Sequence, residues 1–273
     1  MFIILTGSSG VGKNTVIKSL EKEHPSFKLV PTYTTRNKRE NEIEGNPYYF
    51  ITKEDFQQKI KENELIEHEY IHTNYYGSSY KIFDDLISQD KILIKDIGIE
   101  GAQNLEVKLK DRTEIVKIFL TTKSKNDLKQ RLKGRGEQEI KLRLKRYKRE
   151  QAERNRFDYL IFNKDLTDTT KIINFIANMD ISEIMPSKPV NKLSLNKIKR
   201  FSNQLLKGKV LKPIKVVLNE DKVQIINGEE KFIAGLLTNK SVCKEISLGQ
   251  ATNNLSVEQI MEWKRLVRES IEN

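Results

Sequence analysis

The chain has 273 residues, of which 37% are hydrophobic and 32% charged, and its formal net charge is +11. This length suits two domains, and the composition is typical of a soluble globular protein. No apolar run approaches the roughly 20 residues that span a bilayer, and MFIILTGSSG lacks the features of a signal peptide. The single cysteine, Cys243, has no partner for an internal disulfide, so we expect a buried thiol and a reducing, cytoplasmic compartment without membrane contact.

The positive charge is unevenly distributed. Residues 186–273 hold 16 Lys and Arg against 9 Asp and Glu, a balance of +7, and residues 1–185 hold 33 against 29, a balance of +4. A basic excess is compatible with DNA contact, but solvated surface lysines produce the same balance without any partner.

Four short apolar runs, at residues 2–5, 91–96, 115–120 and 159–163, are separated by helix-like segments. This alternation predicts an α/β fold with a parallel sheet and crossover helices. Between the first two runs lies an insert with its own strand signals, KLVPTYTT, YYFIT and LIEHEYI. It also contains a helix predicted from about Lys53 to Glu62, with Thr52 as its cap, so we expect a separate lobe.

The second half of the chain divides at MPSKPV, residues 185–190, where two prolines break the pattern. We therefore predict domains at 1–183 and 188–273. Before the break, residues 124–154 are helical and basic, with a possible hinge at GRG, residues 134–136. After it, a helix, two strands, a turn at NGEE and a helix predict a small α+β domain. A last helix opens at Ser256 with Gln259 in a capping box.

The stretch GSSGVGKNT follows the first apolar run and precedes a helix-forming segment. This context and the glycine and lysine spacing predict a phosphate-binding loop, in which backbone N–H groups surround phosphates and lysine adds a movable charge. The usual hydroxyl residue after the lysine is replaced by Asn14, and Thr15 is the nearest candidate to supply that oxygen. The predicted nucleotide-binding residues are Gly7, Ser8, Ser9, Gly10, Val11, Gly12, Lys13, Asn14 and Thr15.

A second phosphate site is predicted in TYTTRNKRENEIEGNPYYF, residues 32–50. Arg36 and Arg39 have the bidentate donors that suit a phosphate, and Tyr48 adds a neutral donor. Two arginines in a loop are often only solvated, so this prediction depends on the neighbouring motifs.

In order and approximate spacing, the motifs of residues 1–180 resemble those of guanylate kinases. They comprise the glycine-rich loop, the segment from Thr32 to Tyr48, LIEH with Glu67, NYYGSS with Tyr76 and Ser78, KDIGIEGA with Asp96, and the basic RLKGRGEQEIKLRL. The resemblance implies a P-loop nucleoside monophosphate kinase with a parallel sheet, an NMP-binding insert lobe and an Arg-rich lid.

It also implies transfer of the γ-phosphoryl group of ATP to GMP or dGMP, assisted by Mg²⁺. Lys13, Arg135, Arg143 and Asp96 would be catalytic, and Thr15 and Asp96 would hold the metal. The acceptor nucleotide would contact Thr32, Arg36, Arg39, Glu42, Tyr48, Glu67, Tyr76 and Ser78. Glu67 would accept hydrogen bonds from N1–H and the 2-amino group of guanine, with Thr32 and Ser78 near O6.

The sequence departs from the family at Gly98, where a second acidic residue usually lies near the guanine. This leaves two alternatives open: a kinase for a modified or DNA-linked nucleotide, and a non-catalytic guanylate-kinase-like binding module. The intact Lys13 argues against the second. Residues 188–246 resemble the ParB/sulfiredoxin-like superfamily, with Gly228-Glu229-Glu230-Lys231 at its nucleotide motif. A structural α+β domain fits these residues equally well, and DNA contact is a further expectation.

Overall fold

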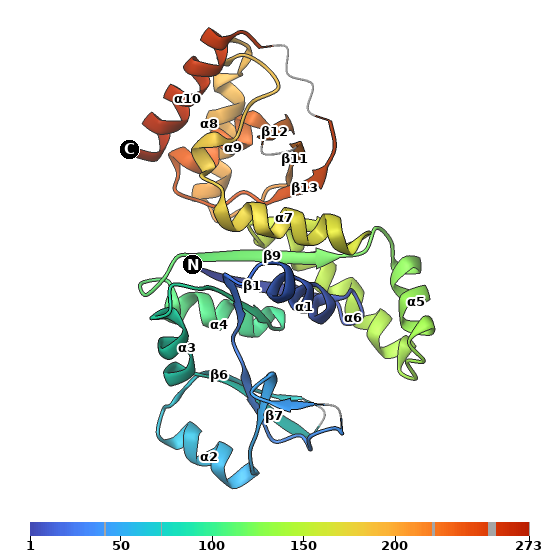
Figure 1. Cartoon of the computed structure of the whole chain (residues 1–273). Coiled ribbons are helices and arrows are strands. Elements are labelled where there is room, and N and C mark those ends of the chain that lie inside the picture. The colour runs from blue at the N-terminus through green and yellow to red at the C-terminus, as the bar shows by residue number, and fades with distance from the viewer. Residues whose placement is uncertain (41, 72, 220–221, 251–254, 273) are drawn as a thin grey trace. The chain divides into compact units, whose positions relative to one another are not determined.

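The computed structural model describes residues 1–40, 42–71, 73–219, 222–250 and 255–272. It falls into two compact units, one of Met1–Gly7 and Gly12–Lys117, the other of Ser8–Val11 and Ile118–Asn273 (Figure 1). Within the described ranges, no helix has both the length and the apolar character needed to cross a membrane. The predicted boundary near residues 184–187 lies inside the second unit, so domains at 1–183 and 188–273 stay a prediction.

The first unit contains three neighbouring parallel strands in the order β1-β8-β2. Residues Phe2–Leu5 are at most 1% exposed, which explains their unbroken apolar run, because both faces of such a strand are covered. The strands are β1 (Phe2–Gly7), β2 (Phe27–Leu29) and β8 (Ile92–Asp96), and the helices are α1 (Lys13–Glu23), α3 (Tyr80–Ile87) and α4 (Ile99–Leu109).

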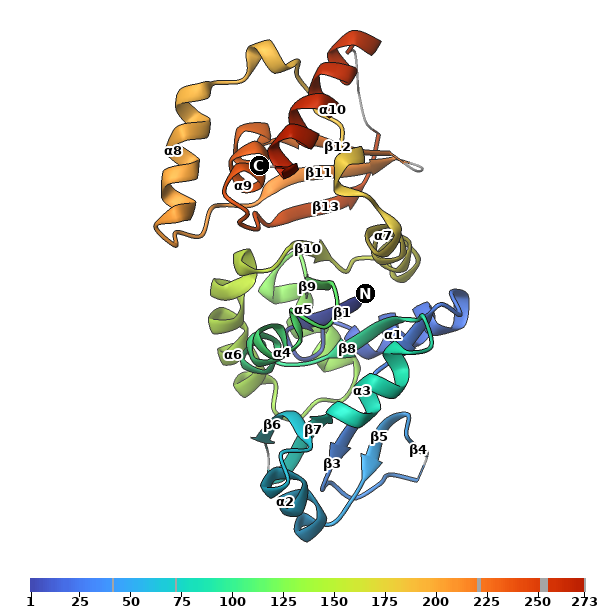
Figure 2. The same cartoon turned by 90° about the vertical axis from the view of Figure 1, so that its left-hand side faces the viewer.

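The predicted insert lobe forms a second sheet in the same unit, with the strand order β4-β5-β3-β7-β6 (Figure 2). Its helix, α2 (Lys53–Lys61), begins where predicted, because the Thr52 hydroxyl accepts a hydrogen bond from the backbone N–H of Asp55. The strands are β3 (Thr32–Thr34), β4 (Ile43–Glu44), β5 (Pro47–Phe50), β6 (Leu65–Ile71) and β7 (Asn74–Ser79).

The second unit contains strands in the order β12-β11-β13-β10-β9. The neighbours β10 and β13 pair in parallel, with Tyr159 opposite Lys244, so the carboxyl-terminal strands continue the sheet that β9 and β10 begin. The strands are β9 (Ile115–Thr121), which starts in the first unit, β10 (Tyr159–Phe162), β11 (Ile214–Asn219), β12 (Lys222–Asn227) and β13 (Lys244–Leu248).

Four helices of the second unit begin at side-chain caps that the sequence encodes. Ser124 and Asp127 form a capping box at the start of α5, and Ser256 and Gln259 form the one predicted for the last helix. The helices are α5 (Lys125–Gly134), α6 (Ile140–Glu153), α7 (Leu166–Asn178), α8 (Leu195–Leu206), α9 (Glu229–Leu237) and α10 (Val257–Glu272). Three short 3₁₀ turns lie at Arg154–Arg156, Ile181–Glu183 and Val190–Lys192.

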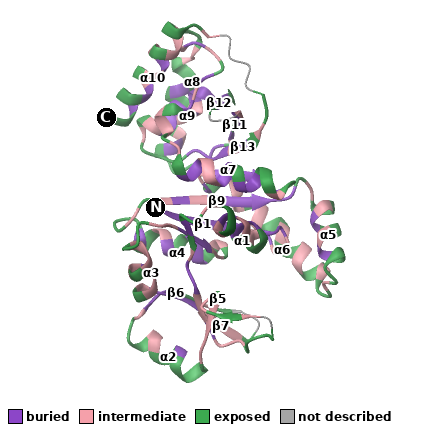
Figure 3. Cartoon of the chain, viewed as in Figure 1, coloured by how far each residue is buried: buried purple, intermediate pink, exposed green. Residues whose placement is uncertain are grey.

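Buried residues of the first unit include those of β1, and buried residues of the second unit include much of β9 and α7 (Figure 3). Cys243 is 1% exposed, and its burial raises the pKa of the thiol to about 12, which confirms a buried, unreactive side chain. Trp263 is fully buried on α10, where it stacks on Phe232 at a centroid distance of 5.9 Å. Its Nε1–H donates to the carbonyl of Ile184 at 2.8 Å, which ties the last helix to the segment after α7.

We predict that Trp263→Ala lowers the free energy of unfolding by about 3–5 kcal/mol, because it leaves a large cavity and an unpaired carbonyl. The shift of the urea unfolding midpoint measures this effect. Met261→Ala on the exposed face of the same helix is the control, since Met261 is 65% exposed. Equal midpoints for the two variants would contradict the packing described for α10.

Candidate active site

The predicted phosphate loop connects β1, which ends at Gly7, to α1, which begins at Lys13. Inside the loop, the backbone N–H of Val11 donates to the carbonyl of Ser8 at 3.1 Å. Gly10 has a φ of 92° and Gly12 a φ of 104°, in the region that favours glycine. A Cβ on Gly10 would lie 2.5 Å from a methyl carbon of Leu132. The loop conformation therefore requires the glycines that its sequence pattern contains.

Lys13 lies between two acceptors of its own unit. Its Nζ donates to the carbonyl of Gly7 at 2.5 Å and lies 3.5 Å from Oδ1 of Asp96. Asp96 ends β8, and Leu5 of β1 is its partner in the parallel pair. Because the carboxyl ends of parallel strands meet at one edge of a sheet, this pairing brings the loop lysine and the predicted metal-binding carboxylate together.

Asn14 and Thr15 are exposed on the first turn of α1. The predicted donors for Mg²⁺, the Thr15 hydroxyl and the Asp96 carboxylate, are both oxygens, which Mg²⁺ prefers. The described ranges contain no group of three or more His, Cys, Asp or Glu side chains that could hold a metal ion alone. A single carboxylate beside a phosphate loop fits Mg²⁺, because this ion is commonly held by one or two carboxylates together with nucleotide phosphates and water.

Two residues that the sequence analysis missed stabilise the loop through hydrogen bonds to one of its carbonyl groups. Arg131 Nη1 and Asn163 Nδ2 both donate to the carbonyl of Val11, at 3.1 and 2.7 Å. The Thr169 hydroxyl in turn donates to Asn163 Oδ1 at 2.9 Å. The only sequence signal for Asn163 is its position directly after β10, where polar residues of α/β sites often lie.

The two predicted lid arginines differ in their surroundings. Arg143, on α6, donates through Nη1 to the Ser9 hydroxyl, and its Nη2 pairs with Glu137 at 2.7 Å. Its Nε and the hydroxyl of Ser8 are buried without a hydrogen-bond partner among the described residues. Buried donors of this kind suit a loop that binds phosphate oxygens. Arg135 is exposed after the end of α5, and the structure does not bring it to the loop residues of its unit.

The predicted base-binding residues form a row across the lobe sheet. Glu67 pairs with Ser78 between β6 and β7, and Tyr48 pairs with Thr32 between β5 and β3. Thr32 directly precedes Tyr33, whose partner in the antiparallel pair is Gly77, so Thr32 lies opposite Ser78. Paired residues share a face of a sheet. The Ser78 hydroxyl donates to the Glu67 carboxylate, which is only 7% exposed.

The predicted phosphate clamp lies on the same lobe. Arg36 Nη2 pairs with Glu42 at 2.7 Å, and its guanidinium lies 5.2 Å from the ring centre of Tyr48. The hydrogen bond between Arg36 and Glu42 raises the pKa of Arg36 and lowers the pKa of Glu42. Burial raises the pKa of Tyr48, which keeps its phenol a donor, and the Tyr76 ring lies 6.0 Å from the Tyr48 ring.

Arg39 is exposed and contributes its backbone N–H to the clamp, donating to Glu42 Oε2 at 2.9 Å. Glu42 thus receives hydrogen bonds from both predicted arginine positions. The structure therefore brings together Arg36, Glu42, Tyr48 and Tyr76, and leaves the Arg39 side chain at the surface.

A buried lysine, which the sequence analysis also missed, lies next to this row. Lys95 on β8 is 2% exposed, and its Nζ donates to the Thr32 hydroxyl at 2.6 Å. Burial lowers the pKa of Lys95 to about 8, against the opposing charges of Glu67 and Asp96. A charged residue inside the apolar run KILIKD was the available sequence signal.

Gly98 precedes α4 as its N-cap residue. A Cβ placed there would meet only Oε2 of Glu69, at 3.8 Å, among its near neighbours. A Cβ on Gly101 would lie 3.6 Å from Oε2 of Glu67. The start of α4 therefore lies next to the carboxylates of Glu67 and Glu69 on β6. Position 98 itself contributes no carboxylate.

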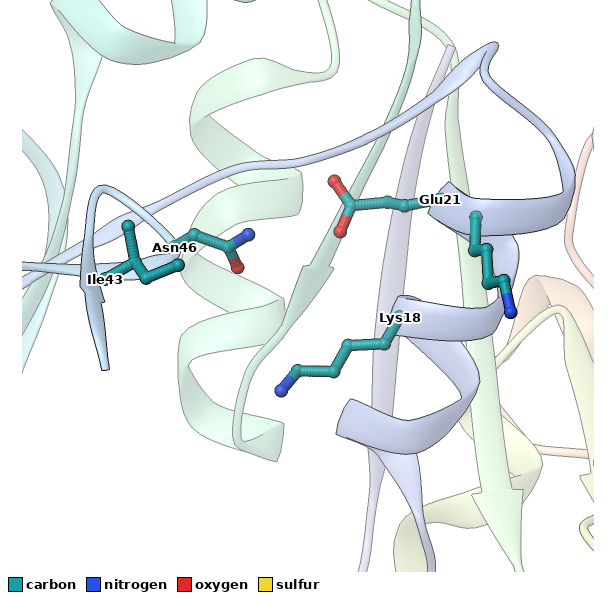
Figure 4. A pocket seen from close by; sticks show the side chains of 5 residues that line it. Lys18, Glu21, Ile43 and Asn46 are labelled. Carbon is teal, nitrogen blue, oxygen red and sulfur yellow. The ribbon is translucent and has the colours of Figure 1, made fainter. Parts of the chain in front are cut away.

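A separate cavity of about 420 Å³ lies between α1 and the turn around β4 (Figure 4). Its lining residues are Lys18, Glu21, Lys22, Ile43 and Asn46, and none of them is a predicted site residue. Glu21 already accepts a hydrogen bond from the backbone N–H of Leu29 at 2.9 Å. Its mixed charges and its distinct set of residues separate it from the loop and the base-binding row.

The motif Gly228-Glu229-Glu230-Lys231 opens α9, with Gly228 at a φ of 110°. The two glutamates are 2% and 6% exposed. Glu229 Oε1 accepts from the hydroxyl of Ser187, and Glu230 Oε1 pairs with Lys188 at 2.9 Å. Hydrogen bonding and the charge of Lys188 outweigh burial and lower the pKa of Glu230. This helix start therefore carries two buried carboxylates that hold the segment before α8.

Comparison with known proteins places this geometry in one family. The guanylate kinase family matches residues 1–179. Guanylate kinase of Wolinella succinogenes is 35% identical over 184 residues, covering 66% of this chain and 85% of the relative. Guanylate kinase of Rickettsia felis is 36% identical over 179 residues, covering 64% of this chain and 92% of the relative.

Among solved structures, the crystal structure of guanylate kinase from Anaplasma phagocytophilum is similar with a TM-score of 0.50 and 26% identity. The similarity covers 65% of this chain and 84% of that chain. The residues that the family matches, 1–179, contain the predicted phosphate loop, the lobe sheet and the helices α5 and α6. On these grounds, the chain belongs to the guanylate kinase family.

Proposed function

We propose that this protein transfers the γ-phosphoryl group of ATP to GMP or dGMP, forming ADP and the nucleoside diphosphate. The row of Glu67, Ser78 and Thr32 beside the Arg36 clamp carries the proposal. It combines a buried carboxylate for a base with a cationic group for a phosphate on one lobe. Family membership and the relatives named guanylate kinase support the same reaction.

The acceptor base is recognised through Glu67. Its carboxylate accepts hydrogen bonds, and guanine presents two adjacent donors, N1–H and the 2-amino group. Adenine has an acceptor at N1, so its binding would leave two acceptors facing each other at a buried position. The acceptor phosphate binds at Arg36, with Tyr48 and Tyr76 as neutral donors that add no charge.

The donor nucleotide binds with its phosphates against the loop. Backbone N–H groups of the loop, the Lys13 ammonium and the Arg143 guanidinium place positive charge where negative charge is redistributed during transfer. Asp96 and Thr15 would hold Mg²⁺, which when bound neutralises charge on phosphate oxygens. The residues themselves bind and orient two nucleotides, and no covalent intermediate on the protein is required.

A binding module without catalysis fits these observations less well. Such a module has no need of a lysine held at 3.5 Å from Asp96 beside the loop. A kinase for a modified or DNA-linked nucleotide remains the alternative that Gly98 favours. The kinase alternative differs from the proposed function in the nucleotide that supports ADP release, and the binding module would release no ADP with any nucleotide.

We also propose that the carboxyl-terminal segment contacts DNA and that the enzyme acts in the cytoplasm. From Ser187 to Asn219 the sequence contains no Asp or Glu and nine basic residues: Lys188, Lys192, Lys197, Lys199, Arg200, Lys207, Lys209, Lys212 and Lys215. All except Lys188 are exposed, and three of them lie in the first half of α8. A run of exposed cations without carboxylates favours a polyanion. The ParB-like character of residues 188–246 stays a prediction.

We predict that the protein releases ADP from ATP with GMP and dGMP, and not with AMP or a 5′-phosphorylated DNA end. Lys13→Ala should lower kcat by about 10²–10³-fold, because it removes charge from the transferring phosphoryl group. Lys28→Ala, at an exposed lysine of the same unit, is the control. ADP release only with the DNA end would replace the proposed function by a kinase for DNA-linked nucleotides. If no acceptor raised ADP release above background ATPase, both kinase functions would be refuted.

We predict that Glu67→Gln lowers kcat/KM for GMP by about 10²-fold, mainly through KM, because an amide group presents a donor where guanine also has one. The ratio of kcat/KM for GMP to that for AMP should fall in parallel. Glu54→Gln, on the exposed first turn of α2, is the control. An unchanged ratio would exclude Glu67 from base recognition.

We predict that the full chain is retained on DNA at low salt and released as salt increases. Replacing Lys197, Lys199 and Arg200 by alanine should reduce the slope of log affinity against log salt by about 2–3, since each phosphate contact contributes about 0.9. The control replaces Lys28, Lys53 and Lys61, three exposed lysines of the first unit, by alanine. Absence of retention at low salt, or equal slopes for both triple variants, would rule out this surface.

A further inference from the structure

Lys95 is the charged group whose position the proposed reaction does not explain. It lies on β8 opposite Ile4 of β1 and is 2% exposed, and the other residues at the paired positions of the two strands are apolar except for Asp96. Burying an ammonium group is unfavourable unless hydrogen bonds and opposite charges compensate. An apolar side chain at this position would pack in the sheet without that cost. Packing alone therefore does not explain a lysine at this position, and its contacts indicate a further role.

The contacts of Lys95 lie at the base-binding row. Its Nζ donates to the Thr32 hydroxyl at 2.6 Å and lies 3.4 Å from the carbonyl of Val30. Glu67 and Asp96 are the negative charges that act on it. Thr32 is half-buried, so part of the residue stays accessible while its hydroxyl contacts Lys95.

The hydrogen-bond geometry at Thr32 determines which way its proton can point. A hydroxyl has one donor and two acceptor lone pairs, and an ammonium group can only donate. The contact with Lys95 therefore uses a lone pair of Thr32 and leaves its proton for another acceptor. The neighbouring Ser78 already donates to Glu67, so the row presents a hydroxyl donor at Thr32 and a carboxylate acceptor at Glu67.

We propose that Lys95 is a positioning residue for base selection, which acts through Thr32 to favour purines with an oxygen at carbon 6. The proton of Thr32 meets the oxygen of a 6-oxo purine as an acceptor. A 6-amino purine presents N–H groups there, so two donors would face each other beside a buried positive charge. This inference rests on the proposed function and adds a second determinant to Glu67.

Gly98 makes the contact between Lys95 and Thr32 more important for base selection. Because position 98 has no side chain to meet the 2-amino group of guanine, recognition depends more on carbon 6 and N1 than on carbon 2. GMP and IMP share the oxygen at carbon 6 and the N1–H, whereas AMP has neither. Lys95 should therefore increase kcat/KM for GMP and IMP alike and not increase it for AMP.

The test compares kcat/KM for GMP, IMP and AMP in the full-length protein and in Lys95→Met, which keeps an unbranched side chain, one atom shorter, and removes its charge. We expect the values for GMP and IMP to fall by about tenfold, mainly through KM, with AMP unchanged or higher. A merely structural role would lower all three values by a common factor, and this outcome would overturn the proposal.

The second buried lysine of the chain supplies the matched control. Lys244, on β13, is 6% exposed and lies 4.9 Å from the ring centre of Tyr159. Lys244→Met makes the same chemical change at a position outside the proposed site. We expect it to leave the three kcat/KM values and their ratios unchanged.

A double-mutant cycle tests whether Lys95 acts through Thr32. Thr32→Val removes the hydroxyl, and the variant that combines it with Lys95→Met should lose no more selectivity for GMP over AMP than Thr32→Val alone. Additive losses would overturn the proposed coupling. If Lys95→Met does not fold, Thr32→Val alone decides, because an unchanged ratio of GMP to AMP in that variant contradicts the proposal.

Failure of this inference and failure of the proposed function give different results. If the unmodified protein releases no ADP with GMP, the proposed function is wrong and the inference falls with it. If the unmodified protein is active and Lys95→Met keeps both its KM for GMP and its selectivity, only the inference is wrong.

Discussion

The parallel pairing of β1 with β8 is the constraint on which the catalytic unit depends. It places Leu5 opposite Asp96 and Ile4 opposite Lys95, so that β8 ends beside the phosphate loop. Successive side chains of a strand point to opposite faces. Asp96 therefore meets Lys13, while Lys95 meets Thr32 of the acceptor lobe. One strand end thus connects the lysine that we propose binds the donor phosphates to the lysine that we propose selects the base.

The cationic residues around the two phosphate positions are already held by acceptors of the chain. Lys13 donates to the carbonyl of Gly7, Arg36 pairs with Glu42, and Arg143 pairs with Glu137. Unpaired charges in half-buried positions are costly, and these pairs keep the side chains oriented at a smaller cost. Phosphate oxygens would bind to groups whose directions are set before the nucleotide arrives, which is how positioning contributes to rate.

The carboxyl-terminal residues combine a tight turn at the start of a helix with two buried carboxylates. Gly228 has the positive φ that a tight turn into α9 uses, and the helix start would favour an anion. Glu229 and Glu230 place carboxylates there, and Ser187 and Lys188 satisfy them. The contact anchors the segment that precedes α8, so the basic surface of α8 and the start of α9 are parts of one packed arrangement.

Much of this protein could be predicted from sequence because the relevant signals are local. The glycine spacing of the loop, the caps at Thr52 and Ser256, and the alternation of strands and helices each depend on neighbouring residues. The order of the family motifs identified the residues that form the row and the clamp. The division into domains and the roles of the site residues stay predictions.

The tertiary structure alone decided which distant residues share a contact. The support of Val11 by Arg131 and Asn163 and the contact of Lys95 with Thr32 join residues that lie 63 to 152 positions apart, and the pairing of β10 with β13 joins distant strands. Periodicity and capping describe a residue's immediate neighbours, whereas strand order and burial depend on the whole chain. The sequence by itself therefore determined the elements, the phosphate loop and the family. Only the folded sheet decided that a lysine inside an apolar strand lies against the base-binding row.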